Sequence, residues 1–269
     1  HFGWLSNYST DLRKKARNFG KLDLGLHLYT FDRVNIEHFI PALSNPYYQD
    51  SSRKEEVAFF AKWNRSFSRL KVFADVQVRH VDLILSGDRN FLGEDPAIPT
   101  RNYLFVNPKL GLTYDLPANW QFYASFGRSG REPTRTDIVG AIQLNTGNLA
   151  QVRDINSVDA EFVNDFEAGF RWQSEKLSVD LNGYYMLFEN EIAPIGPFIN
   201  EGFYQVFMNH ESSFRRGFEL MAKYQLSPSF SVQSQVAYLD AQISSYSPAG
   251  IDVVYKDVRS VLSPEWNGN

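Results

Sequence analysis

Hydrophobic and polar residues alternate along most of the chain. In RGFELMAKYQLSPSFSVQSQVAYLDAQI, residues 216–243, Phe218 and Leu220 fall on one parity, whereas Glu219 and Lys223 fall on the other. Successive side chains of a β-strand point to opposite faces, so a period of two predicts strands with one apolar and one polar face. The alternation recurs in seven further segments: 22–28, 57–64, 70–79, 108–114, 120–127, 166–172 and 177–187. The sequence therefore predicts an all-β protein of about ten strands.

The connections between these segments alternate between short and long. The short connections are 65–69, 115–119, 173–176 and 226–229, and the long ones are 32–53, 86–101, 128–156, 193–202 and 244–250. When every second connection of a meander is short, all tight turns lie at one end of the sheet. Outer-membrane barrels have this asymmetry, with short turns on one side and long loops on the other. We therefore expect an antiparallel up-and-down meander that forms part of a large transmembrane β-barrel.

The two parities differ in charge. The apolar parity of the best strands holds no Asp, Glu, Lys or Arg over about nine residues, the length that crosses a bilayer at a tilt. We expect this parity to face lipid in 216–243, with the following residues: Phe218, Leu220, Ala222, Tyr224, Phe230, Val232, Val236 and Tyr238. Glu219, Lys223, Gln233 and Gln235 should face a lumen, where charges cost little.

Aromatic residues gather near the short connections. Five rings at equivalent positions fit an interfacial girdle facing lipid: Trp63, Tyr114, Trp120, Trp172 and Tyr224. Ordinary packing at sheet ends is the alternative explanation for any one of them.

Composition excludes several other classes of protein. The 269 residues are 15% aromatic, yet no stretch approaches 18 consecutive apolar residues, so no transmembrane helix is expected. The net charge of -4 gives no reason to expect nucleic acid as a partner. There is no cysteine, which excludes a disulfide scaffold. The chain begins at His1 without a charged and apolar leader, and we read it as part of a longer protein.

Motifs for catalysis or nucleotide binding are absent from the sequence, so we expect neither an enzyme nor a cofactor. The loop SGDRNFLGEDP hints weakly at calcium through Asp88, Asn90, Glu94 and Asp95, but it lacks the ligand spacing of an EF-hand. A solvated loop fits it better, and no metal site is expected.

The segment GRSGREPTRTDI, residues 127–138, follows a strong strand. It places Arg128, Arg131 and Arg135 around Glu132. One interpretation is a polar cluster on the lumen wall that contacts a plug or a ligand. The other is a loop entrance held by local ion pairs.

Three hairpins resemble those of TonB-dependent outer-membrane receptors. The segment 107–138 resembles a barrel hairpin in which P-K-x-G-L-x-Y is followed by Y-A-S and R-x-P-T elements. The segment 163–193 is similar to the next hairpin, with E-x-G-x-R and Y-Y-M-x-F-x-N-x-I, and the segment from 215 to 243 to the one after. A further hairpin, 56–82, fits an earlier one. The segment REPTR is similar to the corresponding segment in receptors of the Bacteroidetes type.

This resemblance implies a large barrel around a plug, of about 22 strands. The plug domain, the first strands and the closing strand of the family have no counterpart here. Residues 1–269 would then be a partial β-barrel domain with two open edges.

The resemblance also implies energy-dependent uptake of a scarce solute, such as a ferric siderophore, across a bacterial outer membrane. Expected partners are membrane lipid, the imported small molecule and a TonB-type coupling protein that acts through the plug region. The long loops would form an outer vestibule with four aromatic residues as possible contacts: Phe39, Tyr47, Tyr48 and Phe198. A passive porin-like barrel and a soluble all-β carbohydrate-binding module are the alternatives. The sequence does not name the solute.

Overall fold

In a computed structural model, the chain forms one large antiparallel sheet. The structure describes residues 1–14, 17–37, 48–86, 100–139, 158–194, 198–199, 204–205, 207–246, 253–259 and 264–269. Strands run through Phe2–Lys14 (β1), Arg17–Glu37 (β2), Tyr48–Phe67 (β3), Leu70–Ser86 (β4), Arg101–Asp115 (β5), Trp120–Arg131 (β6), Glu161–Gln173 (β7), Leu177–Ala193 (β8), Met208–Ser227 (β11) and Phe230–Tyr246 (β12). Shorter strands are Phe198–Ile199 (β9), Tyr204–Gln205 (β10), Tyr255–Arg259 (β13) and Trp266–Gly268 (β14), and the helix α2 spans Arg135–Val139.

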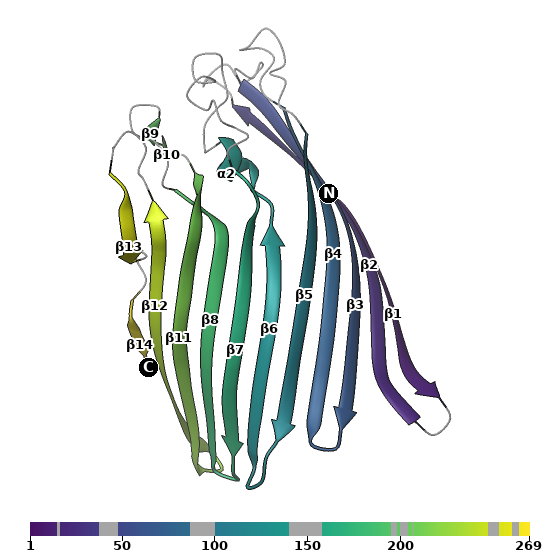
Figure 1. Ribbon diagram of the computed structural model, residues 1–269, viewed down its shortest axis with the longest axis vertical. Coiled ribbons are helices and arrows are strands. Elements are labelled where there is room, and N and C mark those ends of the chain that lie inside the picture. Colours follow the sequence, from purple (N-terminus) through teal and green to yellow (C-terminus); the bar gives the residue numbers. More distant parts are fainter. Residues whose placement is uncertain are drawn as a thin grey trace.

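The sheet has 12 strands in the order β1-β2-β3-β4-β5-β6-β7-β8-β11-β12-β13, with β14 also on β12. Each strand pairs with its neighbour in sequence, except where the small β9–β10 hairpin intervenes between β8 and β11 and where β14 pairs with β12 beside β13. Figure 1 shows β1 at one edge and β13 and β14 at the other, far apart in this open, curved sheet. This confirms the predicted all-β, up-and-down meander.

Tight turns gather at one end of the sheet, as the sequence predicted. The four predicted short connections fall between β3 and β4, β5 and β6, β7 and β8, and β11 and β12. Figure 1 places these turns together at the bottom, and the opposite ends of the same strands lie at the top. The turn end and the loop end are therefore distinct.

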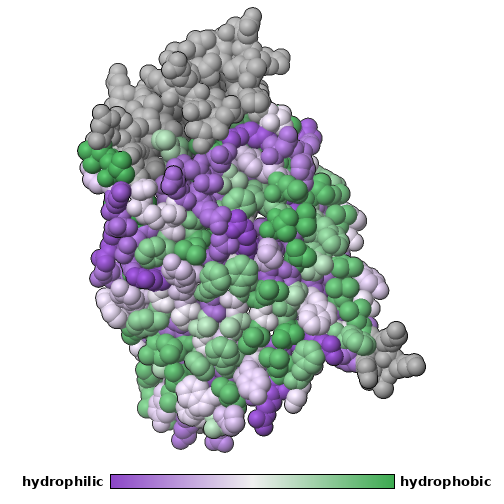
Figure 2. Space-filling model, viewed as in Figure 1, coloured by the Kyte–Doolittle hydropathy of each residue, from purple (hydrophilic) through white to green (hydrophobic). Residues whose placement is uncertain are grey.

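The strands divide their side chains between two faces. On the apolar face, Phe218 pairs with Tyr238, Leu220 with Val236 and Tyr224 with Val232, and large hydrophobic side chains there are exposed along the sheet. On the polar face, Lys223 pairs with Gln233. Figure 2 shows hydrophobic residues at the turn end and up the right side of the view, with hydrophilic residues gathered at the centre and left toward the loop end. A fold that leaves its apolar face uncovered does not bury a core between two layers in the usual way.

The ladder between β5 and β6 stops before the loop end. Its last pair is Lys109 with Gly127, although β6 continues to Arg131. Beyond it, side chains replace the ladder: the Gly130 amide donates to Asn107 Oδ1 at 2.9 Å, and Arg79 Nη2 donates to the Gly130 carbonyl at 3.0 Å. We call this stretch the seam. It lets the chain leave β6 and cross the polar face without losing hydrogen bonds to buried backbone.

Two predictions about element bounds were wrong. The sequence reading missed β1, whose apolar contrast is weak because Ser6 and Thr10 share the face of Trp4 and Tyr8. It also placed residues 32–53 in a loop, whereas β2 continues to Glu37 and β3 begins at Tyr48. Residues 49–53 are all polar, so the period-two signal is lost there although the hydrogen-bonded ladder continues, whereas Val34 and Ile36 of β2 alternate with Arg33 and Asn35 and were overlooked.

Within the described ranges, no helix is both long enough and apolar enough to cross a membrane.

Candidate functional site

A short segment after β6 folds over the polar face of the sheet. Residues 132–139, which we call the strap, include the helix α2, and the strap reaches across β5 to side chains of β2, β3 and β4. The helix begins with a reciprocal cap, in which the Thr134 amide donates to Asp137 Oδ2 and the Asp137 amide donates to Thr134 Oγ1. The cap gives a helix of only five residues a fixed start.

Four charged side chains hold the strap to the sheet. Glu132 accepts from Lys54 Nζ at 2.6 Å and from Arg79 Nη2 at 2.8 Å. Glu56 accepts from the same two groups, at 3.0 Å and 3.2 Å. These residues, the ion quartet, alternate in charge around a closed ring, and their side chains are only 10–26% exposed. Each buried charge therefore has two opposite charges beside it, the arrangement that offsets its desolvation.

The strap carboxylate stays ionised in this setting. Burial raises the pKa of Glu132, but the hydrogen bond from Lys54 and the positive charges of Arg79 and Lys54 outweigh it, so that the pKa lies below its usual value. Arg79 is further fixed by Phe105, whose ring centroid lies 4.8 Å below the guanidinium.

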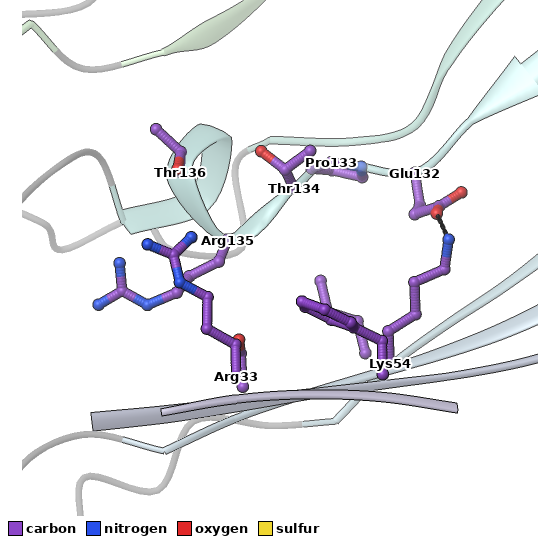
Figure 3. Close-up of a pocket in the computed structure, with 10 residues that line it drawn as sticks. Arg33, Lys54, Glu132, Pro133, Thr134, Arg135 and Thr136 are labelled. Atoms are coloured by element: carbon purple, nitrogen blue, oxygen red, sulfur yellow. Dashed lines mark ion pairs between the residues drawn. The ribbon is translucent and has the colours of Figure 1, made fainter. Parts of the chain in front are cut away.

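A pocket of about 210 Å³ lies between the strap and the strands. It is lined by Phe31, Arg33, Ser52, Lys54, Leu83, Glu132, Pro133, Thr134, Arg135 and Thr136. Figure 3 shows Arg33 and Lys54 rising from the strands toward the strap, with Lys54 joined to Glu132. Three cations and one carboxylate line the pocket, and that carboxylate already binds Lys54 and Arg79. The site has the charge to receive an anion.

The residues predicted from GRSGREPTRTDI separate into three places. Glu132 and Arg135 line the pocket. Arg131 pairs with Glu161 at 2.7 Å and Asp137 at 3.0 Å, which ties the strap to β7.

Arg128 has the parity of the apolar face. It pairs with Glu189 through two contacts of 2.9 Å and stacks on the Phe162 ring at 4.6 Å. A similar pair, Arg216 with Asp240 at 2.9 Å, lies on the apolar parity of β11 and β12. We call these two the outer pairs.

The five girdle candidates lie on the apolar face toward the turn end. Two of the tryptophans also hold backbone there: Trp63 Nε1 donates to the Phe19 carbonyl at 2.8 Å, and Trp172 Nε1 to the Ala118 carbonyl at 3.0 Å. Trp120 packs against Trp172 with ring centroids 6.2 Å apart.

The vestibule candidates fall at or beyond the edge of the described structure. Phe39 and Tyr47 lie outside the described residues, and only the backbone of Tyr48 in β3 and Phe198 in β9 is described. The weak calcium loop of residues 88–95 also lies outside them. Among the residues that the structure does describe, no group of three His, Asp or Glu could hold a metal ion.

Sequence reasoning missed three of the four quartet residues as site residues. Lys54 and Glu56 are close to a presumed loop, and Arg79 was read only as one of many charges on the polar parity. The available signal was the shared parity of Lys54, Glu56 and Arg79 near the loop ends of their strands. That signal predicts which face of the sheet these side chains share. It does not predict that they bind Glu132, because Glu132 follows more than fifty residues after Arg79.

Comparison with known families decides what this sheet is. The model of the family described as "TonB dependent receptor-like, beta-barrel" matches residues 2–269. The chain belongs to this family. Barrels of the TonB-dependent receptors are outer-membrane proteins of Gram-negative bacteria, and the chain is accordingly an outer-membrane protein.

Solved structures of TonB-dependent receptors share the fold. The copper transporter OprC superposes with a TM-score of 0.71 at 14% identity over 90% of this chain, and the ferric citrate transporter FecA with 0.70 at 18% over 99%. The ferric yersiniabactin uptake receptor FyuA from Yersinia pestis gives 0.66 at 15% over 98%. The chain spans only 37% or 38% of the length of these proteins. No curated protein sequence matches the chain.

Proposed function

We propose that the chain is the barrel segment of a receptor that takes up a scarce solute across the outer membrane with energy from a TonB-type partner. Its share of the work is a wall with a lipid-facing apolar side and a polar side that faces the lumen. The observation that carries this proposal is the family match over residues 2–269, combined with an exposed apolar face on which charges are confined to the ends of the strands. Phe218, Leu220 and their neighbours face lipid in this reading.

The charge of the pocket beneath the strap supports a proposal for the chemical class of the solute. Arg33 and Arg135 come from opposite walls, and with Lys54 they give the lining an excess of positive charge. Arginine forks match carboxylates and other planar anions, and Thr134, Thr136 and Ser52 add hydroxyl groups. We propose that the pocket holds an anionic, oxygen-rich part of the solute, as a carboxylate-bearing ferric chelate would offer.

Uptake by the complete parent receptor is the direct test. A strain that lacks the gene should lose accumulation of labelled iron supplied as ferric citrate or as a carboxylate siderophore, and the gene should restore it. A protonophore should abolish the restored uptake, because energy coupling depends on the proton gradient. Uptake that continues at the same rate with the protonophore would identify a passive porin instead.

The anion site has its own test. Arg33→Gln or Arg135→Gln in the parent should weaken binding of the purified receptor to the chelate about tenfold each, the effect of losing one charge-assisted hydrogen bond. Arg171→Gln is the matched control, since Arg171 lies on the polar face but pairs with Asp180 toward the turn end. Equal affinity of all three variants and the parent would remove the pocket from the proposal while leaving uptake untouched.

A further inference from the structure

Four strands carry the same spacing on the apolar face. An aromatic residue near the turn end and a polar residue near the loop end are separated by eight positions: Trp63 and Glu55 on β3, Trp120 and Arg128 on β6, Trp172 and Asn164 on β7, Tyr224 and Arg216 on β11. The residues of the same parity between them are all apolar: Val57, Phe59, Ala61, Phe122, Ala124, Phe126, Phe166, Ala168, Phe170, Phe218, Leu220 and Ala222. We call the two sets the aromatic line and the polar line.

The two lines run obliquely to the hydrogen-bonded rows. One row joins Trp63, Ala74, Leu110, Phe126, Phe166, Tyr185 and Arg216. It starts on the aromatic line at Trp63 and ends on the polar line at Arg216, six strands further on.

A shift of eight residues over six strands has a definite angle. At about 3.3 Å per residue and about 4.8 Å per strand, it corresponds to strands tilted by about 40°. Barrel strands tilt by roughly this amount. With strands tilted by this angle, each line runs parallel to the membrane plane. The two lines are about 20 Å apart along the membrane normal, close to the roughly 25 Å apolar band of an outer-membrane barrel.

Polar groups also lie just outside the polar line on the two strands next to β3. Glu55 pairs in register with Asp82 of β4, which pairs with Asn102 of β5, and because the rows rise toward the loop end these two residues lie on the outer side of the line. The outer pairs lie on the same line, with Arg216 stacked over Phe214 as Arg128 is over Phe162. Their arginine side chains are 58% and 30% exposed. Ionised groups at this height would cost a few kcal/mol in hydrocarbon but little among hydrated headgroups.

We infer that the polar line is the surface at which this barrel wall meets the lipid headgroups of the leaflet on the loop side. The hydrocarbon layer ends there, and β2, β3 and β4 continue beyond it into the aqueous phase. Lys54 and Glu56 flank Glu55 on β3, so the ion quartet lies at headgroup height on the other face. Arg33 and Ser52 lie further out, which places the strap pocket on the external side of the membrane.

This inference rests on the outer-membrane placement and not on the identity of the solute. Its test uses nitroxide labels on the parent receptor, provided that any cysteine of the parent beyond this cysteine-free chain is first replaced. Single cysteines are introduced as Ala74→Cys, Phe126→Cys and Tyr185→Cys, three positions on one row. The receptor is reconstituted in vesicles of phosphatidylcholine and phosphatidylglycerol, and collision rates with oxygen and with a water-soluble nickel chelate are measured.

The label at residue 126 should have the lowest nickel and highest oxygen collision rates, whereas those at 74 and 185 should both lie near a headgroup layer. Ala168→Cys and Asn164→Cys provide a second comparison within one strand, with nickel access rising from 168 to 164. Equal depths along the row would overturn the inference, since the row would then be parallel to the membrane. Low oxygen access at all positions would also overturn it, because the face would be covered by protein. Neither readout depends on uptake.

Discussion

The ion quartet and the outer pairs are two ways of placing charge near the same end of one sheet. The quartet lies on the polar face, where Glu132 and its partners are mostly buried and each charge has two neighbours of opposite sign. The outer pairs lie on the apolar parity, where each charge has one partner of opposite charge and the arginines remain 30% and 58% exposed. Burial makes the quartet costly to disturb, while exposure makes the outer pairs nearly neutral. The quartet fixes the strap to the sheet, whereas the outer pairs mark the edge of the apolar zone.

The largest expected effect comes from opening the quartet. Glu132→Ala leaves Lys54 and Arg79 with only Glu56 between them, so the free energy of unfolding of the parent in detergent should fall by about 3 kcal/mol. Urea unfolding followed by tryptophan fluorescence measures it. The reverse-charge control Lys223→Glu, on the polar face near the turn end, should change the stability little. A loss no greater than that of the control would show that the quartet does not hold the strap.

Charge on the apolar face should act on assembly. Leu220 lies midway between Arg216 and Tyr224, so Leu220→Arg places a cation at the centre of the apolar zone at a cost of about 2–4 kcal/mol. Folding of the parent into vesicles, followed by heat-modifiable migration on gels, should be impaired. Lys223→Glu again serves as the control. Equal folding of both variants would reverse the assignment of the two faces.

The seam separates the two clusters, and its packing can be tested directly. A Cβ on Gly130 would lie 2.3 Å from Phe105 Cδ1 and 2.7 Å from Phe162 Cε1. Because Phe105 is buried, Gly130→Ala should lower the stability by about 1–3 kcal/mol. Gly127→Ala, whose Cβ would meet only Lys109 at 3.5 Å, is the matched control. Identical unfolding curves for the two variants would contradict the close packing at the seam.

Acid should weaken the quartet. The pKa of Glu132 is lowered by Lys54 and Arg79 despite burial, so its contribution is present above the unfolded-state pKa and is lost as pH falls through the lower folded-state value. The free energy of unfolding of the parent should therefore fall between neutral pH and the acid range, and it should fall less in Glu132→Gln. The same pH dependence in both proteins would remove Glu132 from this effect.

The smallest expected effect is that of an outer pair. Glu189→Gln removes the carboxylate beside Arg128 but leaves an exposed arginine that water or headgroups solvate, so the stability should change by less than about 1 kcal/mol. The same urea titration measures it beside Glu132→Ala. A loss comparable to that of Glu132→Ala would mean that the contrast between the two clusters is wrong.

Much of the fold was predictable because strand alternation and connection length are local properties. Segments such as 166–172 and 177–187 show an apolar parity that the sheet exposes, and the four short connections became turns. The predictions failed where the ladder continues with a weak or absent hydrophobic pattern, as in β1 and in the outer part of β3, and they overlooked the short alternation around Val34 and Ile36 of β2. Backbone hydrogen bonds stabilise a strand whatever its side chains, so the pattern disappears before the strand ends.

The candidate site was predictable only in part. REPTR was recognisable as a polar segment, but the partners of Glu132 lie on β3 and β4, and no spacing in the sequence connects them. Arg128 illustrates the other limit: it is three residues from Arg131, yet it faces the opposite side of the sheet because strand parity continues through it. Proximity in sequence grouped four residues that the fold distributes over three locations.

The separation of turn end from loop end has a consequence for how such proteins can diversify. The four described tight turns lie at the same end as the aromatic line, and the connections at the opposite end are longer. Insertions, deletions or exchange of whole loops would therefore alter what the receptor recognises without shifting the register of the strands. One wall of strands could in this way carry different loops, so that the loops and the strand framework can change independently.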